Sequence, residues 1–489
     1  FDDSGQPRPV RVVDAGVRRQ TDIRVVSACD DMRHPEDGSV WTSICRTLLE
    51  MVSSHSSTII FANTRRVVER LTMGINELAG EELVQPHHGS VSAPLRRRTE
   101  QALKNGTLKG VVATGTLELG IDSGAVDLVC QVESPKEISR GLQRVGRAGH
   151  TYKATSVGRI IPKSSTDLAE SVAVAAGMLE GDVEPMSVPR NCLDVLAQQI
   201  VAMAALEPTT IDDVYRTVRR TYPFHELSEE AFNLTLQLVS GRYPSKLFRD
   251  LRPRVSLDRV TGRISPLPGS QKLVIANGGA IPDTGEYGVY LAEANLKLGE
   301  LDEEFVYESR EGDTFSLGTH NWKIVKIEAD RVVVEHGSPH QARMPFWRGE
   351  SVSRSARTGR RMGEVLRTIA EKGESAYKWA VQSLPVDERA ARGLCDLVSA
   401  QVGTAGESGL PTDRRIVLET FPDEVGALRL ALLSVFGGRI HHALRIALTA
   451  LIKRELGMEP ESVCGDNGVL IRLPDGDAPA PRDLIRRLT

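Results

Sequence analysis

The sequence lacks the features that are typical of secreted, zinc-binding or membrane-spanning proteins. Its six cysteines form no C-x-x-C pair, which argues against a zinc site and a disulfide framework and indicates a reducing compartment. No apolar run approaches the roughly 20 residues that a membrane helix needs, and no signal peptide is expected. We therefore expect a cytoplasmic protein with no membrane partner.

An excess of positive charge is lacking as well. The net charge of −4 gives no global attraction to nucleic acid, so any such binding must come from local basic clusters. Three clusters are present, at residues 96–98, 242–254 and 354–361.

Two segments carry residues suited to binding phosphate. The first, V-V-A-T-G-T-L-E-L-G-I-D at 111–122, has a β-branched strand that ends at Thr114 and Gly115, where amide and hydroxyl groups can meet a phosphate. The second, S-R-G-L-Q-R-V-G-R-A-G-H at 139–150, places Arg144 and Arg147 at positions i and i+3 of a short helix. Both guanidinium groups would then project from one face toward a shared anion such as a polyphosphate. A surface helix with solvated arginines is the alternative.

These segments resemble motifs five and six of superfamily two helicases, which lie in the second of two RecA-like domains. The resemblance implies that Gln143 and Arg144 contact the γ-phosphate of ATP and that Arg147 is the arginine finger. It also places Gly120 and Asp122 in the nucleotide site, with the aspartate contacting the ribose or the finger.

The first RecA-like domain is not recognisable in this chain. Neither a G-x-x-x-x-G-K-[ST] phosphate loop nor a D-E-x-[DH] magnesium motif occurs, and the opening residues from Phe1 read as the middle of a loop. We therefore expect the first domain and its Mg²⁺ ligands to lie outside this chain. The chain alone is then expected to be inactive, although it belongs to an ATP-dependent enzyme.

Residues 1–185 alternate short apolar strands with helices, which predicts a parallel sheet covered on both faces. Strands are expected at 10–13, 23–26, 57–62, 83–85, 110–114, 126–132 and 159–161, with an amphipathic helix at 40–52. Asn63 and Arg65 follow a buried strand and resemble motif four, and His88 and Ser90 resemble the conserved block after it. These four residues, together with Thr114 and Thr116, are the predicted nucleic-acid contacts in this domain. For His88, a polar loop end is the alternative.

Residues 186–280 predict a winged-helix domain. Three amphipathic helices, at 192–206, 211–221 and 229–240, precede two short strands joined by a turn at 254–265. A plain helical linker is the alternative.

Residues 281–489 predict a small β-barrel followed by a helical region. Strands are expected at 287–291, 305–307, 314–317, 322–327 and 331–334, and one final strand at 469–473. Leu444, Leu448, Leu451 and Ile452 form an apolar stripe expected in a core, whereas His441 and His442 are expected at the surface. The fold class predicted for the whole chain is α/β plus α+β.

The stretches I-P-D-T-G-x-Y-G-V-Y-L and P-F-W-R-G-E resemble the large helicase-related (Lhr) family. That resemblance implies an ATP- and Mg²⁺-dependent enzyme that moves 3′ to 5′ on single-stranded DNA and unwinds DNA or RNA:DNA duplexes, in DNA repair. It also implies that Trp347 stacks on DNA, assisted by Ile281; alternatively, Phe346 and Trp347 both plug the barrel. The rival function is a non-catalytic module that binds nucleic acid or regulates a partner.

Overall fold

The computed structural model of the 489-residue chain describes residues 2, 6–13, 20–118, 126–149, 155–242, 252–278, 286–294, 296–318, 320–328, 330–337, 343, 352–422, 428–457 and 460–473. The chain divides into two compact units. The small unit contains residues 1–17 and 185–284, and the large unit contains residues 18–184 and 285–489. None of the described helices is long and apolar enough to cross a membrane.

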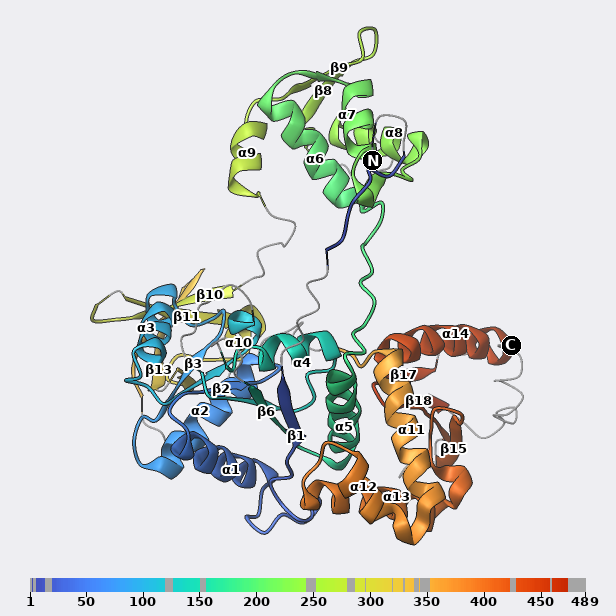
Figure 1. Cartoon of the computed structure of the whole chain (residues 1–489). Coiled ribbons are helices and arrows are strands. Elements are labelled where there is room, and N and C mark those ends of the chain that lie inside the picture. Colours follow the sequence, from blue (N-terminus) through green and yellow to red (C-terminus); the bar gives the residue numbers. More distant parts are fainter. Residues whose placement is uncertain are drawn as a thin grey trace. The chain divides into compact units, whose positions relative to one another are not determined.

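The large unit begins with a six-stranded parallel sheet in the order β1-β6-β5-β2-β4-β3 (Figure 1). Its strands are β1 (Thr21–Val25), β2 (Thr58–Phe61), β3 (Val84–His87), β4 (Gly110–Ala113), β5 (Leu128–Val132) and β6 (Ser156–Ile161). The central strands β2, β4 and β5 are buried throughout, as their continuous apolar runs require in a sheet covered on both faces. The predicted parallel sheet is confirmed. A strand at 10–13 is wrong, because these residues are exposed and adopt no regular structure.

Helices cover both faces of this sheet. They are α1 (Val40–Ser54), α2 (Arg65–Ala79), α3 (Ala93–Lys104), α4 (Ile138–Val145) and α5 (Ser165–Glu180). Side chains of Ser39, Thr64 and Ser164 cap α1, α2 and α5 by accepting a backbone N–H of the first turn. α1 and α2 pack on one face, whereas α4 and α5 pack on the other.

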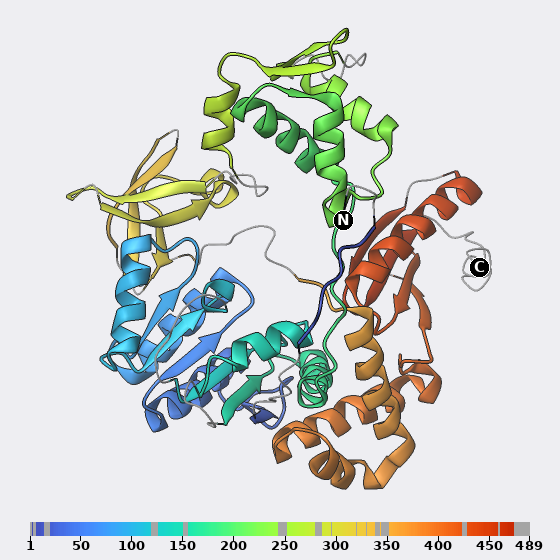
Figure 2. The same cartoon turned by 45° about the horizontal axis from the view of Figure 1, so that its top comes forward.

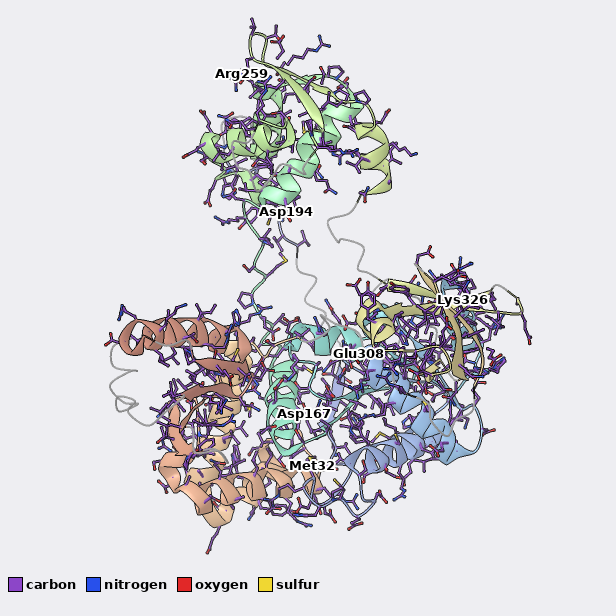
Figure 3. All side chains as sticks on the ribbon, turned by 180° about the vertical axis from the view of Figure 1, so that it is seen from behind. Met32, Asp167, Asp194, Arg259, Glu308 and Lys326 are labelled. Carbon is purple, nitrogen blue, oxygen red and sulfur yellow. The ribbon has the colours of Figure 1, made fainter. Side chains whose placement is uncertain are left out.

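The small unit has the predicted winged-helix architecture. Its elements are α6 (Leu193–Leu206), β7 (Thr209–Thr210), α7 (Ile211–Arg219), α8 (Glu229–Val239), β8 (Val255–Asp258), β9 (Arg263–Pro266) and α9 (Ser270–Ala276), and its sheet order is β7-β9-β8. The helices share one apolar core with β8 and β9. Arg259 lies in the turn between β8 and β9 and is exposed (Figure 3).

A curled five-stranded sheet, a half-barrel, follows in the large unit and confirms the predicted β-rich segment. Its strands are β10 (Glu286–Leu291), β11 (Leu296–Asp302), β12 (Thr314–Leu317), β13 (His320–Ile327) and β14 (Arg331–His336), in the order β11-β10-β14-β13-β12. The strand expected at 305–307 is wrong, because those residues form the short helix α10 (Glu303–Tyr307). β11 was not expected from the sequence.

The C-terminal part combines helices with a second sheet. Helices α11 (Ala356–Lys372), α12 (Ala376–Ser383) and α13 (Glu388–Ala405) precede β15 (Val417–Pro422), β16 (Leu428–Leu433), α14 (Gly438–Leu456), β17 (Glu461–Gly465) and β18 (Gly468–Leu473). The final strand is confirmed, and the antiparallel order β15-β16-β18-β17 adds three strands that were not expected. α11 and α13 pack on α5, where the orange helices lie beside the teal one in Figure 2.

Two side-chain predictions in α14 have different outcomes. Leu448, Leu451 and Ile452 are buried against the C-terminal sheet, as expected for a core stripe. The surface position expected for His441 is wrong, because its side chain is fully buried and its Nδ1 lies 2.7 Å from the Gly465 carbonyl oxygen. His442 is exposed, as expected.

Helix α4 packs closely on β6 at Gly158. A Cβ added at Gly158 would lie 2.6 Å from Cγ2 of Val145, the last residue of α4. Val145 is buried and β-branched, so it cannot swing aside. We predict that Gly158→Ala lowers the free energy of unfolding by about 1–3 kcal/mol, because overpacking forces α4 off the sheet.

The measurement is urea unfolding followed by tryptophan fluorescence, because all four tryptophans, at 41, 322, 347 and 379, belong to the large unit. The matched control is Gly465→Ala in β17, where an added Cβ meets nothing within 4 Å. Equal unfolding midpoints for the two variants would contradict the close packing.

Candidate nucleotide site and nucleic-acid interface

The site forms at the carboxyl edge of the parallel sheet, where β2, β4 and β5 end side by side. Asn63 follows β2, Thr114 and Gly115 follow β4, and Glu133 follows β5. Thr114 is half-buried and Gly115 is exposed, so this strand end is open to solvent. Parallel sheets bind ligands in the crevice beyond the carboxyl ends of their strands.

Arg144 of α4 joins three of these strand ends. Its Nε donates to Oε1 of Glu118 at 2.6 Å, and its Nη1 donates to Oε1 of Gln131 at 2.6 Å and to Oδ1 of Asn63 at 3.1 Å. The guanidinium also lies over the Phe61 ring, 5.2 Å from its centroid. Only 2% of Arg144 is exposed, and this burial lowers the pKa of the guanidinium while the Glu118 carboxylate opposes the shift. Arg144 therefore holds the motif-bearing segments together.

Arg147 lies outside the helix that carries Arg144. α4 ends at Val145, and the Arg147 N–H donates to the Arg144 carbonyl oxygen at 3.0 Å in the turn that follows. The expectation that both guanidinium groups project from one helix face is wrong, because Arg144 is turned into the protein. Arg147 is half-buried and Gln143 is exposed. Their roles toward ATP stay predictions.

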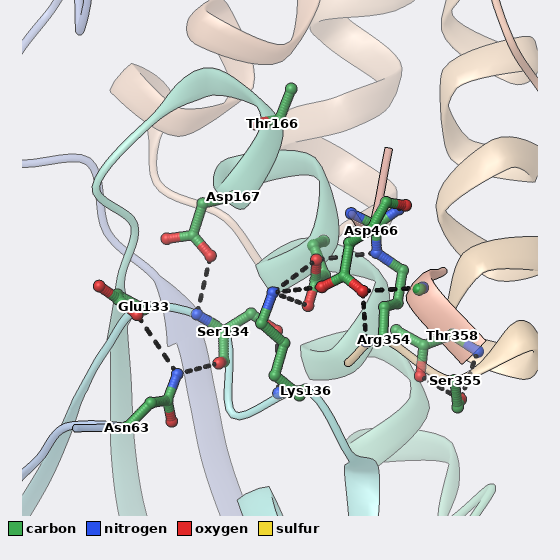
Figure 4. Close-up of polar contacts among 12 residues, drawn as sticks. Asn63, Glu133, Ser134, Lys136, Thr166, Asp167, Arg354, Ser355, Thr358 and Asp466 are labelled. Atoms are coloured by element: carbon green, nitrogen blue, oxygen red, sulfur yellow. Dashed lines mark hydrogen bonds and ion pairs between the residues drawn. The ribbon is translucent and has the colours of Figure 1, made fainter. Parts of the chain in front are cut away.

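The loop between β5 and α4 is held in an unusual backbone conformation. Glu133 and Lys136 have φ values of 66° and 70°, which cost free energy for residues other than glycine. Asn63 Nδ2 donates to the Ser134 carbonyl oxygen at 2.8 Å, and the Ser134 N–H donates to Asp167 at 2.9 Å (Figure 4). Burial raises the pKa of the Asp167 carboxyl to about 6, although the N–H groups of Ser134 and Lys163 oppose the shift. Sequence reasoning missed this support, since Asp167 carries no motif.

The predicted nucleic-acid contacts after β3 are mostly engaged within the protein. His88 and Glu69 are fully buried, and their Nε2 and Oε1 atoms lie 2.7 Å apart. Arg65 donates to the Ser90 hydroxyl and, at 2.8 Å, to Glu286 of the half-barrel. Burial argues against direct contact of the His88 and Ser90 side chains with nucleic acid. The Glu69 carboxylate and the Ser90 carbonyl oxygen accept the N–H groups of Gly318 and Glu300, at 3.0 Å and 2.8 Å, so this region joins the parallel-sheet domain to the half-barrel.

Thr116 and Thr114 lie beside the buried His87. The Thr116 hydroxyl donates to the His87 carbonyl oxygen at 3.0 Å, and its oxygen lies 2.8 Å from His87 Nδ1. The Thr114 N–H donates to that carbonyl at 3.2 Å. The two threonines are half-buried at an open strand end, where hydroxyl groups can reach a phosphate without reading sequence.

Three of the four arginines in the basic cluster at 354–361 pair with carboxylates of the parallel-sheet domain. Arg354 is 2% exposed, and its Nε donates to the buried Glu170 at 2.8 Å. Arg357 and Arg361 both bind Asp182, at the end of α5. These arginines fasten the C-terminal helices to the parallel-sheet domain, and Figure 4 shows the contacts of Arg354.

Four predicted site residues, Gly120, Asp122, Ile281 and Trp347, lie outside the described residues. Among the described residues, no group of three His, Cys, Asp or Glu side chains is placed to hold a metal ion.

Three family models match the chain. The helicase conserved C-terminal domain matches residues 41–151, the winged helix domain of large helicase-related proteins matches 176–344, and the DEAD/H associated family matches 410–489.

Relatives match nearly the whole chain. The Lhr helicase/probable uracil glycosylase of Mycolicibacterium smegmatis is 41% identical over 98% of this chain and 34% of its own length. The ATP-dependent helicase Lhr-Core of Saccharolobus solfataricus is 32% identical over 95% of this chain and 54% of its own length. A solved structure of Mycobacterium smegmatis helicase Lhr bound to ssDNA and AMP-PNP has a TM-score of 0.78 at 38% identity, covering 96% of this chain and 57% of that chain.

The parallel sheet, the arginine-bearing helix at its carboxyl edge and the winged helix define the C-terminal portion of a helicase core. Its homologues are ATP-dependent helicases. The chain belongs to the Lhr family. It spans about a third to about half of the length of the relatives described above.

Proposed function

We propose that this chain is the C-terminal part of an ATP-driven translocase that moves 3′ to 5′ on single-stranded DNA and separates DNA or RNA:DNA duplexes in DNA repair. The observation that carries the proposal is the position of α4, whose Arg144 is fixed at the carboxyl edge of the sheet with Arg147 directly after it. The 38% identical structure, bound to ssDNA and AMP-PNP, supports both ligands.

In the proposed reaction, water attacks the γ-phosphorus of ATP and ADP leaves. Arg147 would neutralise the charge that develops on the transferred phosphoryl group, and Gln143 would contact the γ-phosphate. Asp122 would contact the ribose or Arg147. Mg²⁺ and the phosphates would be held by the first RecA-like lobe. Arg144, buried as it is, would act by keeping α4 in place.

The nucleic acid would pass the open strand ends and the half-barrel side of the large unit. Thr114 and Thr116 would contact its phosphates, Arg65 would contribute when it exchanges Glu286 for a phosphate, and Trp347 would stack on a base with Ile281 beside it. In the small unit, the exposed Arg259 at the tip of the β8–β9 turn suits a backbone contact.

We predict that the isolated chain hydrolyses no ATP, with or without single-stranded DNA, because the groups that position the β- and γ-phosphates are expected on the other lobe. The measurement is phosphate release by purified chain, with the complete two-lobed helicase as the positive control. DNA-stimulated turnover by the isolated chain, abolished in its Arg147→Ala variant, would disprove the division of the catalyst between two lobes. Inactivity of the two-lobed protein as well would favour a non-catalytic binding module.

A further inference from the structure

Glu184 caps the helix that carries Arg144 from outside that helix. Its Oε1 accepts the Ile138 N–H at 2.6 Å, and its Oε2 accepts the Ser139 N–H at 3.0 Å. These are first-turn N–H groups of α4, which have no partner within the helix. A carboxylate there is favoured both by hydrogen bonding and by the helix dipole.

Glu184 also lies where the chain passes from the large unit to the small unit. Glu184 is the last residue of the large unit before the chain passes into the small unit at Pro185. Two residues earlier, Asp182 is fixed by Arg357 and Arg361 of α11, and its N–H donates to the Gly177 carbonyl oxygen at 3.0 Å. Only Val183 separates this fixed point from the cap. A pull on the connection therefore acts on the first turn of α4 through Glu184, and α4 can respond by a small slide along α5.

α4 is suited to respond as a rigid body. At Gly141 it lies so close to α5 that an added Cβ would be 2.6 Å from Sδ of Met178. The last turn of α4 carries Arg144 with its hydrogen bond to Glu118, and Arg147 follows three residues later. Because a short, closely packed helix shifts as a unit, a change at its first turn displaces the residues at its last.

The second connection to the small unit is also held by a carboxylate. Glu286, the first described residue after that unit, accepts from Arg65 Nη1 at 2.8 Å, and Arg65 begins α2. Glu184 and Glu286, which lie at two connections to the small unit, thus both bind segments predicted to contact nucleotide or nucleic acid.

We propose that Glu184 is a positioning residue that couples nucleic-acid binding by the winged-helix unit to the placement of Arg147, an inference that rests on the proposed function. Nucleic acid held by the small unit shifts the connection at Pro185, and the Glu184 carboxylate transmits that shift to α4. Regulation of ATP hydrolysis by DNA then depends on the two hydrogen bonds at the first turn of α4.

The test uses the complete helicase with Glu184→Ala, which removes both bonds, and Glu184→Gln, which keeps one acceptor oxygen. We expect the stimulation of ATP turnover by single-stranded DNA to fall about tenfold in Glu184→Ala and less in Glu184→Gln, as for a coupling free energy of ordinary size. The DNA concentration for half-maximal stimulation should stay unchanged, and the melting temperature should fall by only a few degrees, as for the loss of one helix cap. A merely structural role would instead lower the melting temperature together with every activity.

The matched control is Glu137→Ala. Glu137 is the N-cap residue of α4 and carries the same charge, but its side chain makes no capping hydrogen bond and pairs with Arg140 at 3.6 Å. Stimulation within twofold of the wild type in Glu184→Ala, or an equal loss in Glu137→Ala, would overturn the inference. If Arg147→Ala still abolishes turnover in that case, the proposed function stands and only the coupling fails.

Discussion

Replacing Arg147 with alanine in the complete helicase is expected to lower ATP turnover at least ~100-fold, as the loss of an arginine finger does, while leaving single-stranded DNA binding nearly intact. Arg147 follows α4 in a turn whose backbone is held by the bond from its N–H to the Arg144 carbonyl oxygen. The loss would fall on the transition state, and turnover would decrease more than ATP binding. Steady-state phosphate release and DNA binding by fluorescence anisotropy measure the two quantities.

Arg140→Ala is the matched control for this prediction. Arg140 lies on the same helix, and its ion pair with Glu137, 3.6 Å long, is partly exposed. Removing the Arg140 side chain therefore changes the local charge equally without touching the turn, and turnover should stay within about twofold, since such pairs contribute little. A decrease of less than tenfold in Arg147→Ala would show that Arg147 is not the finger.

The alternation of strands and helices made the parallel sheet predictable, but the secondary structure of short apolar runs could not be predicted from their sequence. Val10, Val12 and Val13 looked like a strand, yet they are at least 80% exposed, and in the described part of the chain no strand pairs with them. Residues 305–307 are equally short and apolar, and they form helix α10, whose Phe305 packs on Phe315 at 5.9 Å between ring centroids. So short an apolar run fits the helical period of 3.6 residues as well as the strand period of 2, and tertiary packing decides which structure forms.

The C-terminal sheet was missed for a related reason. β16 has the sequence L-R-L-A-L-L, which fits a helix as well as a strand. It pairs with the preceding strand β15, but its other partner, β18, lies beyond the whole of α14. Such distant pairing leaves no local pattern. His441 was misplaced because the sequence around it shows no partner, and only the strand pair β17–β18 brings the Gly465 carbonyl oxygen to its ring.

The candidate site was predictable as a set of motifs but not as a geometry. The motifs at 111–122 and 139–150 predicted a position at the carboxyl edge of the sheet, and their described residues lie there, because parallel strands present their carboxyl ends together. The orientation of Arg144 could not be predicted, because its three acceptors come from separate segments that only the fold brings together. Glu184 could not be found either, since an isolated glutamate before a proline carries no signal of its own.

The buried network around Arg144 leads to a prediction that needs only this chain. Arg144→Ala is expected to lower the free energy of unfolding of the large unit by about 3–5 kcal/mol, because removing one partner leaves the other charge uncompensated. The Glu118 side chain is only 15% exposed and would lose both of its contacts with the guanidinium, while Gln131 and Asn63 would each lose a donor.

Arg159→Ala in β6 is the control for that measurement. Arg159 pairs with Asp22 at 2.8 Å and donates to the carbonyl oxygens of Asp22 and Gly158, but the Asp22 side chain is 42% exposed. Water can replace much of what is lost, so a change of about 1 kcal/mol, well below that of Arg144→Ala, is expected. Both variants are followed by tryptophan fluorescence during urea unfolding, because every tryptophan belongs to the large unit.

A double-mutant cycle separates the two roles that Arg144 can have. If Arg144 is a structural junction, Arg144→Ala combined with Glu118→Ala destabilises less than the sum of the single variants, because removing either partner already breaks the pair. If Arg144 serves only to contact the γ-phosphate, Arg144→Ala unfolds at the wild-type urea concentration, and its defect appears only as lost turnover in the complete helicase. The buried, fourfold-bonded guanidinium makes the first outcome the expected one, with α4 displaced and Arg147 carried away from the nucleotide as a consequence.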